Sequence, residues 1–331
     1  MNRFARLCLL ALSLACGGLH AAEHTTADAA FEFALIGDTP YTGMSHPRFD
    51  RTIELLNRRQ PELAWVIHTG DIKAGIGPCS DALYLERFET FQRFRMPFIL
   101  TPGDNEWTDC HRPLAGGYQP LERLKRLREI FYPRPGQTLG RTPMTVETQA
   151  SRPGFESFPE HVRWERGGVL FAGLHLVGSF NGLNRFPGRT RADDEEVKQR
   201  TEAALAWLRD TFAQAKARGS KGVFLFMQAN PGFDVGPKTS TARAFSGFLR
   251  VLEAEVVAFG RPVLLAHGDT HQHRIDQPLK RSGSGETVTN FTRVENFASE
   301  TDWVRIRVDP ANPRVFSATA EIALDPAELT P

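Results

Sequence analysis

Four short apolar segments of the 331-residue chain each end in a Gly-Asp pair. The aspartates of these pairs are Asp38, Asp71, Asp104 and Asp269. A carboxylate at the exit of a buried strand is costly unless it binds a partner. One Gly-Asp pair alone is typical of a turn, but four indicate a single site assembled from several strand ends. Carboxylates, amides and histidines from separate segments are the ligands that a pair of divalent cations needs, with one carboxylate shared between the two.

The segments around the first three pairs predict alternating strands and helices. Strands are expected at 31–37, 62–69 and 96–101, because these runs are short, apolar and bounded by Gly, Pro and Asp. Helices are expected at 48–59, 81–95 and 120–132, where apolar residues recur at helical spacing. This alternation predicts a largely parallel sheet, in which ligands gather at the carboxyl ends of the strands.

The second half of the chain continues this pattern. After a Pro- and Gly-rich loop at 133–160, we expect a hairpin within 162–179. Helices are then expected at 193–218 and 240–258, and strands at 222–230 and 262–267. Several short polar strands are expected between 272 and 323. The prediction is an α/β fold with one domain over residues 23–331. Its architecture would be a four-layer αββα sandwich of two mixed β-sheets flanked by helices.

Residues 1–22 predict a bacterial-type secretory signal peptide. Arg3 and Arg6 precede an apolar run that is too short to span a membrane as a helix, and small residues follow it. Cleavage is expected near Ala21 or Ala22, which would deliver the protein to the periplasm or the medium. A lipoprotein anchor at Cys16 is the alternative, but the sequence SLAC lacks the usual Leu three residues before the cysteine.

The charge balance excludes two classes of partner. Without residues 1–22 the chain carries 38 basic and 39 acidic side chains. Such a chain has no electrostatic attraction for nucleic acid or for an anionic membrane surface. We also expect no integral membrane segment after the signal peptide.

Two cysteines remain after the signal peptide. Cys79 and Cys110 follow the second and third Gly-Asp pairs. In an oxidising compartment a disulfide between them is expected, in preference to two free thiols. Such a bond would join two of the loops that leave the strand ends.

Five segments resemble, in order, the motifs of the calcineurin-like metallophosphoesterase superfamily. The superfamily pattern is D-x-H, G-D, G-N-H-[DE], a lone His after a strand, and G-H-x-H. The corresponding segments here are GDTPY, GDIK, GDNE, MQAN and GDTH, at 37–41, 70–73, 103–106, 227–230 and 268–271. The resemblance implies a hydrolase that binds two divalent metal ions and cleaves a small phosphate mono- or diester with a metal-activated water.

The same resemblance implies a role for each matching residue. Asp71 would bridge the two metals. The first metal would be bound by Asp38 and His271, and the second by Asp104, Gln228 and Asp269. Asp104 replaces an Asn of the superfamily pattern, whereas Gln228 and Asp269 each replace a His. The second set therefore contains only oxygen donors, which suits Mg²⁺, Mn²⁺ or Ca²⁺ better than Zn²⁺.

Two further departures affect the chemistry. Pro40 stands at the His position of the first motif and cannot bind a metal, so Tyr41 or His273 would have to replace that ligand. Asn105 stands at the position of the superfamily's catalytic His. Its amide can hydrogen-bond a phosphoryl oxygen, but it cannot supply a proton to the leaving group.

Either another group donates that proton, or the substrate has a good leaving group, or the protein has lost activity. Lys73, His68, His111 and His175 are candidates, and Lys73 would alternatively contact phosphate or be a solvated loop residue. The leading hypothesis is an exported metal-dependent phosphoesterase. The alternatives are a degenerate relative that binds metal or a phosphorylated ligand without turnover, and an envelope protein that uses a Ca²⁺ site for stability.

Overall fold

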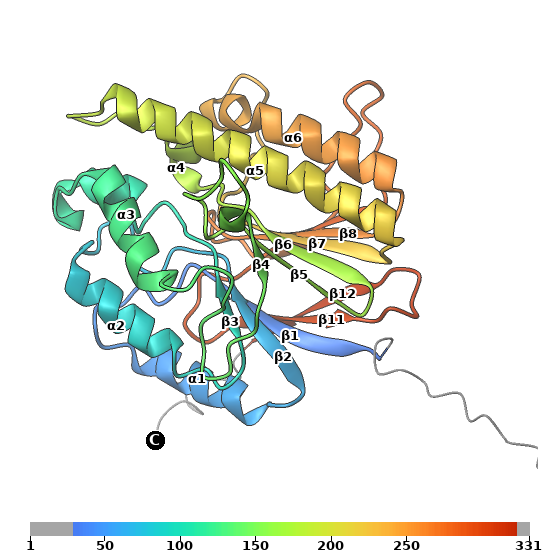
Figure 1. Cartoon of the computed structure of the whole chain (residues 1–331), viewed down its shortest axis with the longest axis horizontal. Coiled ribbons are helices and arrows are strands. Elements are labelled where there is room, and N and C mark those ends of the chain that lie inside the picture. Colours follow the sequence, from blue (N-terminus) through green and yellow to red (C-terminus); the bar gives the residue numbers. More distant parts are fainter. Residues whose placement is uncertain (1–28, 323–331) are drawn as a thin grey trace, which may run out of the picture.

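The computed structural model describes residues 29–322, and within them two β-sheets pack face to face (Figure 1). Helices cover the outer face of each sheet, which confirms the predicted αββα sandwich. The predicted signal peptide and Cys16 lie outside the described residues. Among the helices of this described part, none combines the length and the apolar character needed to cross a membrane.

The first sheet contains the first three predicted strands. Its order is β12-β11-β1-β2-β3, in which β1, β2 and β3 run parallel and β11 and β12 are antiparallel to their neighbours. The strands are β1 (Phe31–Ile36), β2 (Leu63–His68), β3 (Phe98–Leu100), β11 (Trp303–Val308) and β12 (Phe316–Glu321). The helices of this half are α1 (Pro47–Arg58), α2 (Asp81–Phe91) and α3 (Pro120–Phe131).

The second sheet has the order β4-β5-β6-β7-β8-β10-β9, with β6, β7, β8 and β10 parallel. Its strands are β4 (Glu147–Thr148), β5 (Val162–Arg166), β6 (Val169–Gly173), β7 (Gly222–Phe226), β8 (Val263–His267), β9 (Arg274–Asp276) and β10 (Phe291–Glu295). Two long helices, α5 (Arg191–Arg218) and α6 (Ser240–Phe259), cover its outer face (Figure 1).

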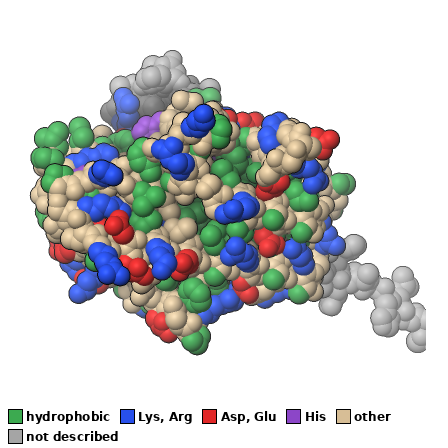
Figure 2. Space-filling model, turned by 90° about the horizontal axis from the view of Figure 1, so that it is seen from above, with side chains coloured by type: hydrophobic (Ala, Val, Ile, Leu, Met, Phe, Trp, Pro, Cys, Tyr) green, Lys and Arg blue, Asp and Glu red, His purple; other side chains and the backbone are tan. Residues whose placement is uncertain are grey.

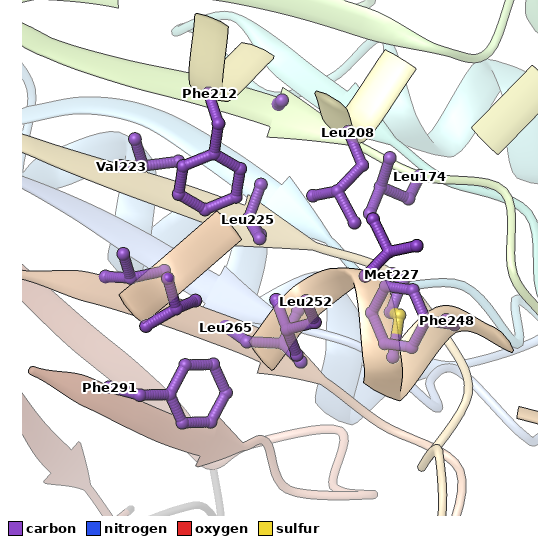
Figure 3. Close-up of a cluster of buried hydrophobic side chains, with 14 of the residues drawn as sticks. Leu174, Leu208, Phe212, Val223, Leu225, Met227, Phe248, Leu252, Leu265 and Phe291 are labelled. Atoms are coloured by element: carbon purple, nitrogen blue, oxygen red, sulfur yellow. The ribbon is translucent and has the colours of Figure 1, made fainter. Parts of the chain in front are cut away.

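Apolar cores fill the spaces between the layers. Leu208 and Phe212 of α5 and Leu252 of α6 lie against Leu225 and Leu265 of the second sheet (Figure 3). The aromatic side chains of Phe33, Trp65, Phe171 and Phe224 pack between the two sheets. Because the central strands are covered on both faces, their sequences are continuous apolar runs. Basic and acidic side chains are interspersed on the outer surface seen in Figure 2.

The predicted elements are all present, with differences at their ends. The helix expected at 81–95 ends at Phe91, since the chain turns there before Pro97 and Asn57 bonds the backbone of the turn. The long helix starts at Arg191, after a Thr190 capping box, rather than at 193. The strand expected at 222–230 ends at Phe226. A short turn, α4 (Gly178–Gly182), was not predicted.

Cys79 and Cys110 form the expected disulfide, with their Cα atoms 5.8 Å apart. Cys79 precedes α2, and Cys110 belongs to a 3₁₀ helix, η2 (Thr108–His111), that follows β3. Both residues are buried in the core beneath α2 and α3. The bond therefore fastens together the loops that follow β2 and β3.

We expect the double variant Cys79→Ser/Cys110→Ser to unfold more easily than the wild type. The bond joins residues 31 positions apart, and closing a loop of about this length stabilises a folded protein by ~3–4 kcal/mol. Urea unfolding of both proteins, with and without a reductant, measures the difference. A reductant should lower the stability of the wild type only, and equal stability of the two proteins in the absence of reductant would contradict the prediction.

Candidate functional site

Backbone hydrogen bonds join the loops that leave the parallel strands at one edge of the sandwich. The Asp38 N–H, after β1, donates to the Gly70 carbonyl after β2 (2.9 Å). The Asn105 N–H, after β3, donates to Asp71 Oδ1 (3.1 Å). Across the two sheets, the Asp269 N–H donates to Asp38 Oδ1 (3.0 Å). The structure thus brings three of the predicted strand-end loops to one place, and β8 of the other sheet contributes the fourth.

Asp104 and Asp269 face each other across Gly178, the first residue of α4. A Cβ atom at Gly178 would lie 2.6 Å from Asp269 Oδ1 and 2.9 Å from Asp104 Oδ1. The backbone N–H of Asn230 donates to the other oxygen of Asp269 (3.0 Å). The carboxylates from β3 and β8 therefore point into the same narrow space, which only a glycine leaves open.

Glycine is required in two of the Gly-Asp pairs because a carboxylate of another pair lies against it. A Cβ at Gly268 would be 2.0 Å from Asp38 Oδ2, and a Cβ at Gly103 would be 2.1 Å from Asp71 Oδ1. Such distances are impossible for real atoms. Each of these glycines makes room for the aspartate of a neighbouring loop, which explains the repeated pattern in the sequence.

Tyr41 lies at the centre of these groups. Its hydroxyl is 3.0 Å from His271 Nε2, 3.4 Å from Asp71 Oδ2 and 3.5 Å from Asp38 Oδ1. His273, the other candidate for the missing ligand, instead stacks on Phe297 and places Nδ1 2.8 Å from the Glu295 carbonyl. Of these two candidates, Tyr41 is the one that the structure places beside the aspartates.

Gln228 lies next to Asp71, but both ends of its amide are hydrogen-bonded. Its Nε2 donates to Asp71 Oδ2 (3.1 Å), and its Oε1 accepts from the Gly178 N–H (2.6 Å). The backbone donor at Gly178 fixes the orientation of the amide. In this arrangement Gln228 orients Asp71, and the oxygen expected to bind a metal faces the backbone.

Asn105 and Lys73 border the same cluster. The Asn105 amide nitrogen lies 3.5 Å from the Tyr41 hydroxyl. Lys73 is buried, so it is not a solvated loop residue, and its Nζ donates to the Ala74 carbonyl (2.9 Å). Burial lowers the pKa of Lys73 to about 8, although the charges of Glu106 and Asp71 oppose this shift.

Burial and mutual repulsion raise the pKa values of the carboxyl groups. Burial is the main cause for Asp71, whose pKa lies well above its usual range, and the charge of Asp104 adds to it. The same two causes raise the pKa of Asp269 to about 8. Burial also raises the pKa of Asp38, and raises that of Glu106 to about 7. Full ionisation of these carboxyl groups would thus create more negative charge than their protein neighbours neutralise.

Several of these residues have an unusual backbone. Asp38, Asp71, Asp269 and His271 have φ angles of +53°, +58°, +85° and +59°. Non-glycine residues rarely adopt this left-handed region, and Asp tolerates it better than most. Such a backbone persists only where the surrounding structure enforces it, and it is concentrated at functional sites.

The fully buried Arg87 of α2 holds the backbone of the loops after β1 and β2 in place. Its Nε donates to the Ile72 carbonyl (2.8 Å). Its Nη2 donates to the Thr42 carbonyl (2.7 Å) and lies 3.3 Å from that of Pro40. One guanidinium thus fixes the backbone on either side of Tyr41 and immediately after Asp71.

Three nearby polar residues were missed by the sequence analysis. Asp109 is buried on η2, accepts a hydrogen bond from Ser179 (2.9 Å) and forms an ion pair with Arg112 (2.6 Å). Ser179 lies in α4, where three consecutive residues adopt left-handed angles. The one available signal was the i, i+3 spacing of Asp109 and Arg112 beside the Gly-Asp-Asn-Glu segment.

The histidines considered as proton donors have other partners. His68 is fully buried, its Nε2 donates to the Thr39 carbonyl, and burial lowers its pKa to about 4. His175 is buried against Glu160, with 2.7 Å between Nδ1 and the carboxylate. His111 stacks on Phe186 and bonds the backbone of its own helix. None of these contacts directs an imidazole toward Asn105.

The donors fit a divalent cation in chemistry, although they are not closed around one. No group of three or more His, Cys, Asp or Glu side chains between residues 29 and 322 is arranged to hold a metal ion. The Tyr41 hydroxyl and the Gln228 amide lie among the carboxylates instead. Asp38 Oδ2, however, is buried without a hydrogen-bond partner. Carboxylate oxygens in this number are the ligands that hard divalent cations prefer.

Comparisons with known proteins find a family model and solved structures that match this chain. The family model of the calcineurin-like phosphoesterases matches residues 31–273. The solved structure of PhoD is similar in fold, with a TM-score of 0.50 and 12% identity over 85% of this chain. A purple acid phosphatase, PPD1 from yellow lupin (Lupinus luteus) seeds, matches with a TM-score of 0.45 and 9% identity over 88% of this chain. The matches span 64% of the PhoD chain and 54% of the lupin chain. No curated protein matches the sequence.

We expect Asp269→Asn to stabilise the metal-free protein at alkaline pH. The pKa of Asp269 is raised from 3.8 to about 8 in the folded state. Between these values the unfolded chain binds fewer protons than the folded one, so the wild type loses stability as the pH rises. An amide does not ionise, and the variant should therefore be more stable than the wild type at pH 8 by at least about 1 kcal/mol.

Urea unfolding in the presence of a chelator, at pH 4, 6 and 8, measures this gain. The gain should shrink toward zero at pH 4. Asp194→Asn, at a side chain that is 65% exposed on α5, is the control and should show no comparable gain at pH 8. A variant that loses stability equally at all three pH values would contradict the prediction.

Proposed function

Because the chain belongs to the calcineurin-like phosphoesterase family, we propose that it hydrolyses a phosphate mono- or diester with the help of two divalent metal ions. The observation that carries this proposal is the meeting of Asp38, Asp71, Asp104 and Asp269 at one edge of the sandwich. Buried carboxylates that repel one another would be stabilised by bound cations.

We propose that Asp71 bridges the two cations, since it lies between the other groups. Asp38 and His271 would hold the first cation, and the Tyr41 hydroxyl would take the place of the missing histidine. Asp104 and Asp269 would hold the second cation. The hydrogen bonds of Gln228 favour a role in orienting Asp71 over the ligand role inferred from its position in the sequence.

Bound cations would supply the positive charge that lowers the pKa of a water molecule and neutralises charge on the phosphoryl group. The remaining work falls to the protein. The Asn105 N–H fixes Asp71, while the Asn105 amide is available to orient a phosphoryl oxygen. Lys73 is best explained as a buried positive charge beside Asp71 and Glu106, rather than as a group that contacts phosphate.

The donor set favours hard cations. Carboxylates and a phenol make the first choice Mg²⁺ or Mn²⁺, with Ca²⁺ as a further possibility. His271 is the single nitrogen ligand in this proposal, and Zn²⁺ prefers sites with more nitrogen or sulfur.

A specific observation supports the second candidate, a protein that binds metal or a phosphorylated ligand without turnover. Asn105 cannot protonate a leaving group, and His68 and His175 are held by other partners. A substrate whose leaving group departs readily as an anion would need no such acid. The two candidates therefore differ in whether turnover is observed and in how it depends on the leaving group.

We also propose that the protein acts outside the cytoplasm. The sequence pattern of residues 1–22 supports export. The disulfide between Cys79 and Cys110 agrees with an oxidising compartment.

We expect Asp71→Asn to abolish metal-dependent hydrolysis. Losing the shared carboxylate would disturb both cations, and turnover should fall at least ~100-fold. The assay uses p-nitrophenyl phosphate and bis(p-nitrophenyl) phosphate with Mn²⁺, Mg²⁺, Ca²⁺ or Zn²⁺ added singly. Glu62→Gln, at an exposed acid before β2 and at the opposite end of that strand, is the matched control. Undiminished turnover in Asp71→Asn would refute the proposed site.

Tyr41→Phe should weaken metal binding with little effect on folding. The change removes one oxygen that touches Asp38, Asp71 and His271, and losing one ligand should reduce affinity by about 10-fold or more. Calorimetric titration with Mn²⁺ measures the affinity, and thermal unfolding checks the fold. An unchanged Mn²⁺ affinity would show that Tyr41 is not a ligand.

A further inference from the structure

Arg112 lies beside the residue that replaces the family's catalytic histidine. A Cβ atom at Gly75 would be 2.8 Å from both Arg112 Nη1 and Asn105 Oδ1, so these two atoms are at most twice that distance apart. The other end of the Asn105 amide faces the Tyr41 hydroxyl. Arg112 thus lies beside Asn105, which in turn lies beside Tyr41 at the carboxylate cluster.

The guanidinium of Arg112 is held in place and is also open to solvent. Its Nη2 lies 2.6 Å from Asp109 Oδ2, and Asp109 is 1% exposed whereas Arg112 is 40% exposed. Ser179 donates to both carboxylate oxygens of Asp109, at 2.9 and 3.1 Å. A buried, doubly bonded carboxylate therefore fixes one edge of the guanidinium, and Nη1 lies on the side of Asn105.

Such an arrangement suits recognition of a phosphate group. Guanidinium is permanently charged and presents several N–H donors in a plane that matches phosphate oxygens. Because Gly75 has no side chain, the guanidinium is able to lie beside the Asn105 amide. The fixed position of Arg112 also lowers the entropy lost when it binds a ligand.

We propose that Arg112, together with the Asn105 amide, binds a phosphoryl oxygen of the substrate and selects phosphate monoesters over diesters. This inference builds on the proposed function and specifies its substrate class. A monoester carries a charge of about −1.5 to −2 at neutral pH. A diester carries a single charge, and its second substituent occupies one of the oxygens that would face Arg112. The Arg112 guanidinium therefore attracts a monoester more strongly than a diester.

The test compares wild type, Arg112→Met and Arg112→Lys, with Arg141→Met as the matched control. Arg141 is an exposed arginine on the loop after α3. Arg112→Met keeps most of the apolar stem and removes the charge, although it leaves Asp109 without its cation. Arg112→Lys keeps the charge and loses the planar fork, so it provides a second variant if the first fails to fold.

Two measurements are made on Mn²⁺-loaded protein. Calorimetry gives the affinity for inorganic phosphate, and kinetics give kcat/KM for p-nitrophenyl phosphate and for bis(p-nitrophenyl) phosphate. In Arg112→Met we expect phosphate affinity and monoester kcat/KM to fall about 10- to 100-fold, with a smaller loss for the diester. Arg112→Lys should be intermediate, Arg141→Met should match the wild type, and Mn²⁺ affinity should be unchanged throughout.

The outcomes separate the inference from the proposed function. Phosphate binding that depends on Arg112, without turnover by the wild type, would support the inference and refute the phosphoesterase. Turnover with unchanged phosphate affinity in both Arg112 variants would refute the inference alone, as would equal losses for the two esters. A wild type that neither binds phosphate nor hydrolyses esters would refute both.

Discussion

Electrostatic repulsion among buried carboxylates is the constraint on which the rest of the structure depends. Asp38, Asp71, Asp104 and Asp269 are brought together from two sheets, although the charges of Asp104 and Asp38 raise the cost of ionising both Asp71 and Asp269. Folding alone does not favour such a cluster. The parallel strands, packed on both faces by apolar side chains, supply the stability that holds these charges at one edge. The cluster of carboxylates thus lowers the stability of the folded protein, and the apolar cores between the layers offset this loss.

Backbone N–H groups, rather than salt bridges, fix the positions of several of the aspartate side chains. N–H groups of Asn105, Asp269 and Asn230 each donate to an aspartate of another loop. These donors do not titrate, and Asp38 Oδ2 stays buried without a hydrogen-bond partner. Asp38, Asp71 and Asp269 have left-handed backbone angles, and the glycines of neighbouring pairs provide the space for the carboxylates. The short Gly-Asp turns therefore determine both the positions and the charges of the groups at the site.

The fold and the convergence of the aspartates could be predicted from the sequence because they follow from local patterns. Apolar runs of strand length indicate buried strands, and the Gly-Asp pairs indicate the tight turns that follow them. The choice between Tyr41 and His273 depended instead on which loop Arg87 fixes, which is a long-range contact. The orientation of Gln228 depended on the Gly178 N–H in α4, a turn in which three consecutive non-glycine residues adopt left-handed angles. No local pattern predicts either of these contacts.

Arg87 limits how this protein can change during evolution. Its donors reach carbonyls on either side of Tyr41 in the loop after β1 and a carbonyl next to Asp71 in the loop after β2. A lysine has three donors on a single nitrogen and cannot reach acceptors spread over that distance. Replacement would leave several carbonyls in the interior without partners. The lengths of both loops are consequently tied to the position of one helix, so new specificities should arise more readily in loops that Arg87 does not touch.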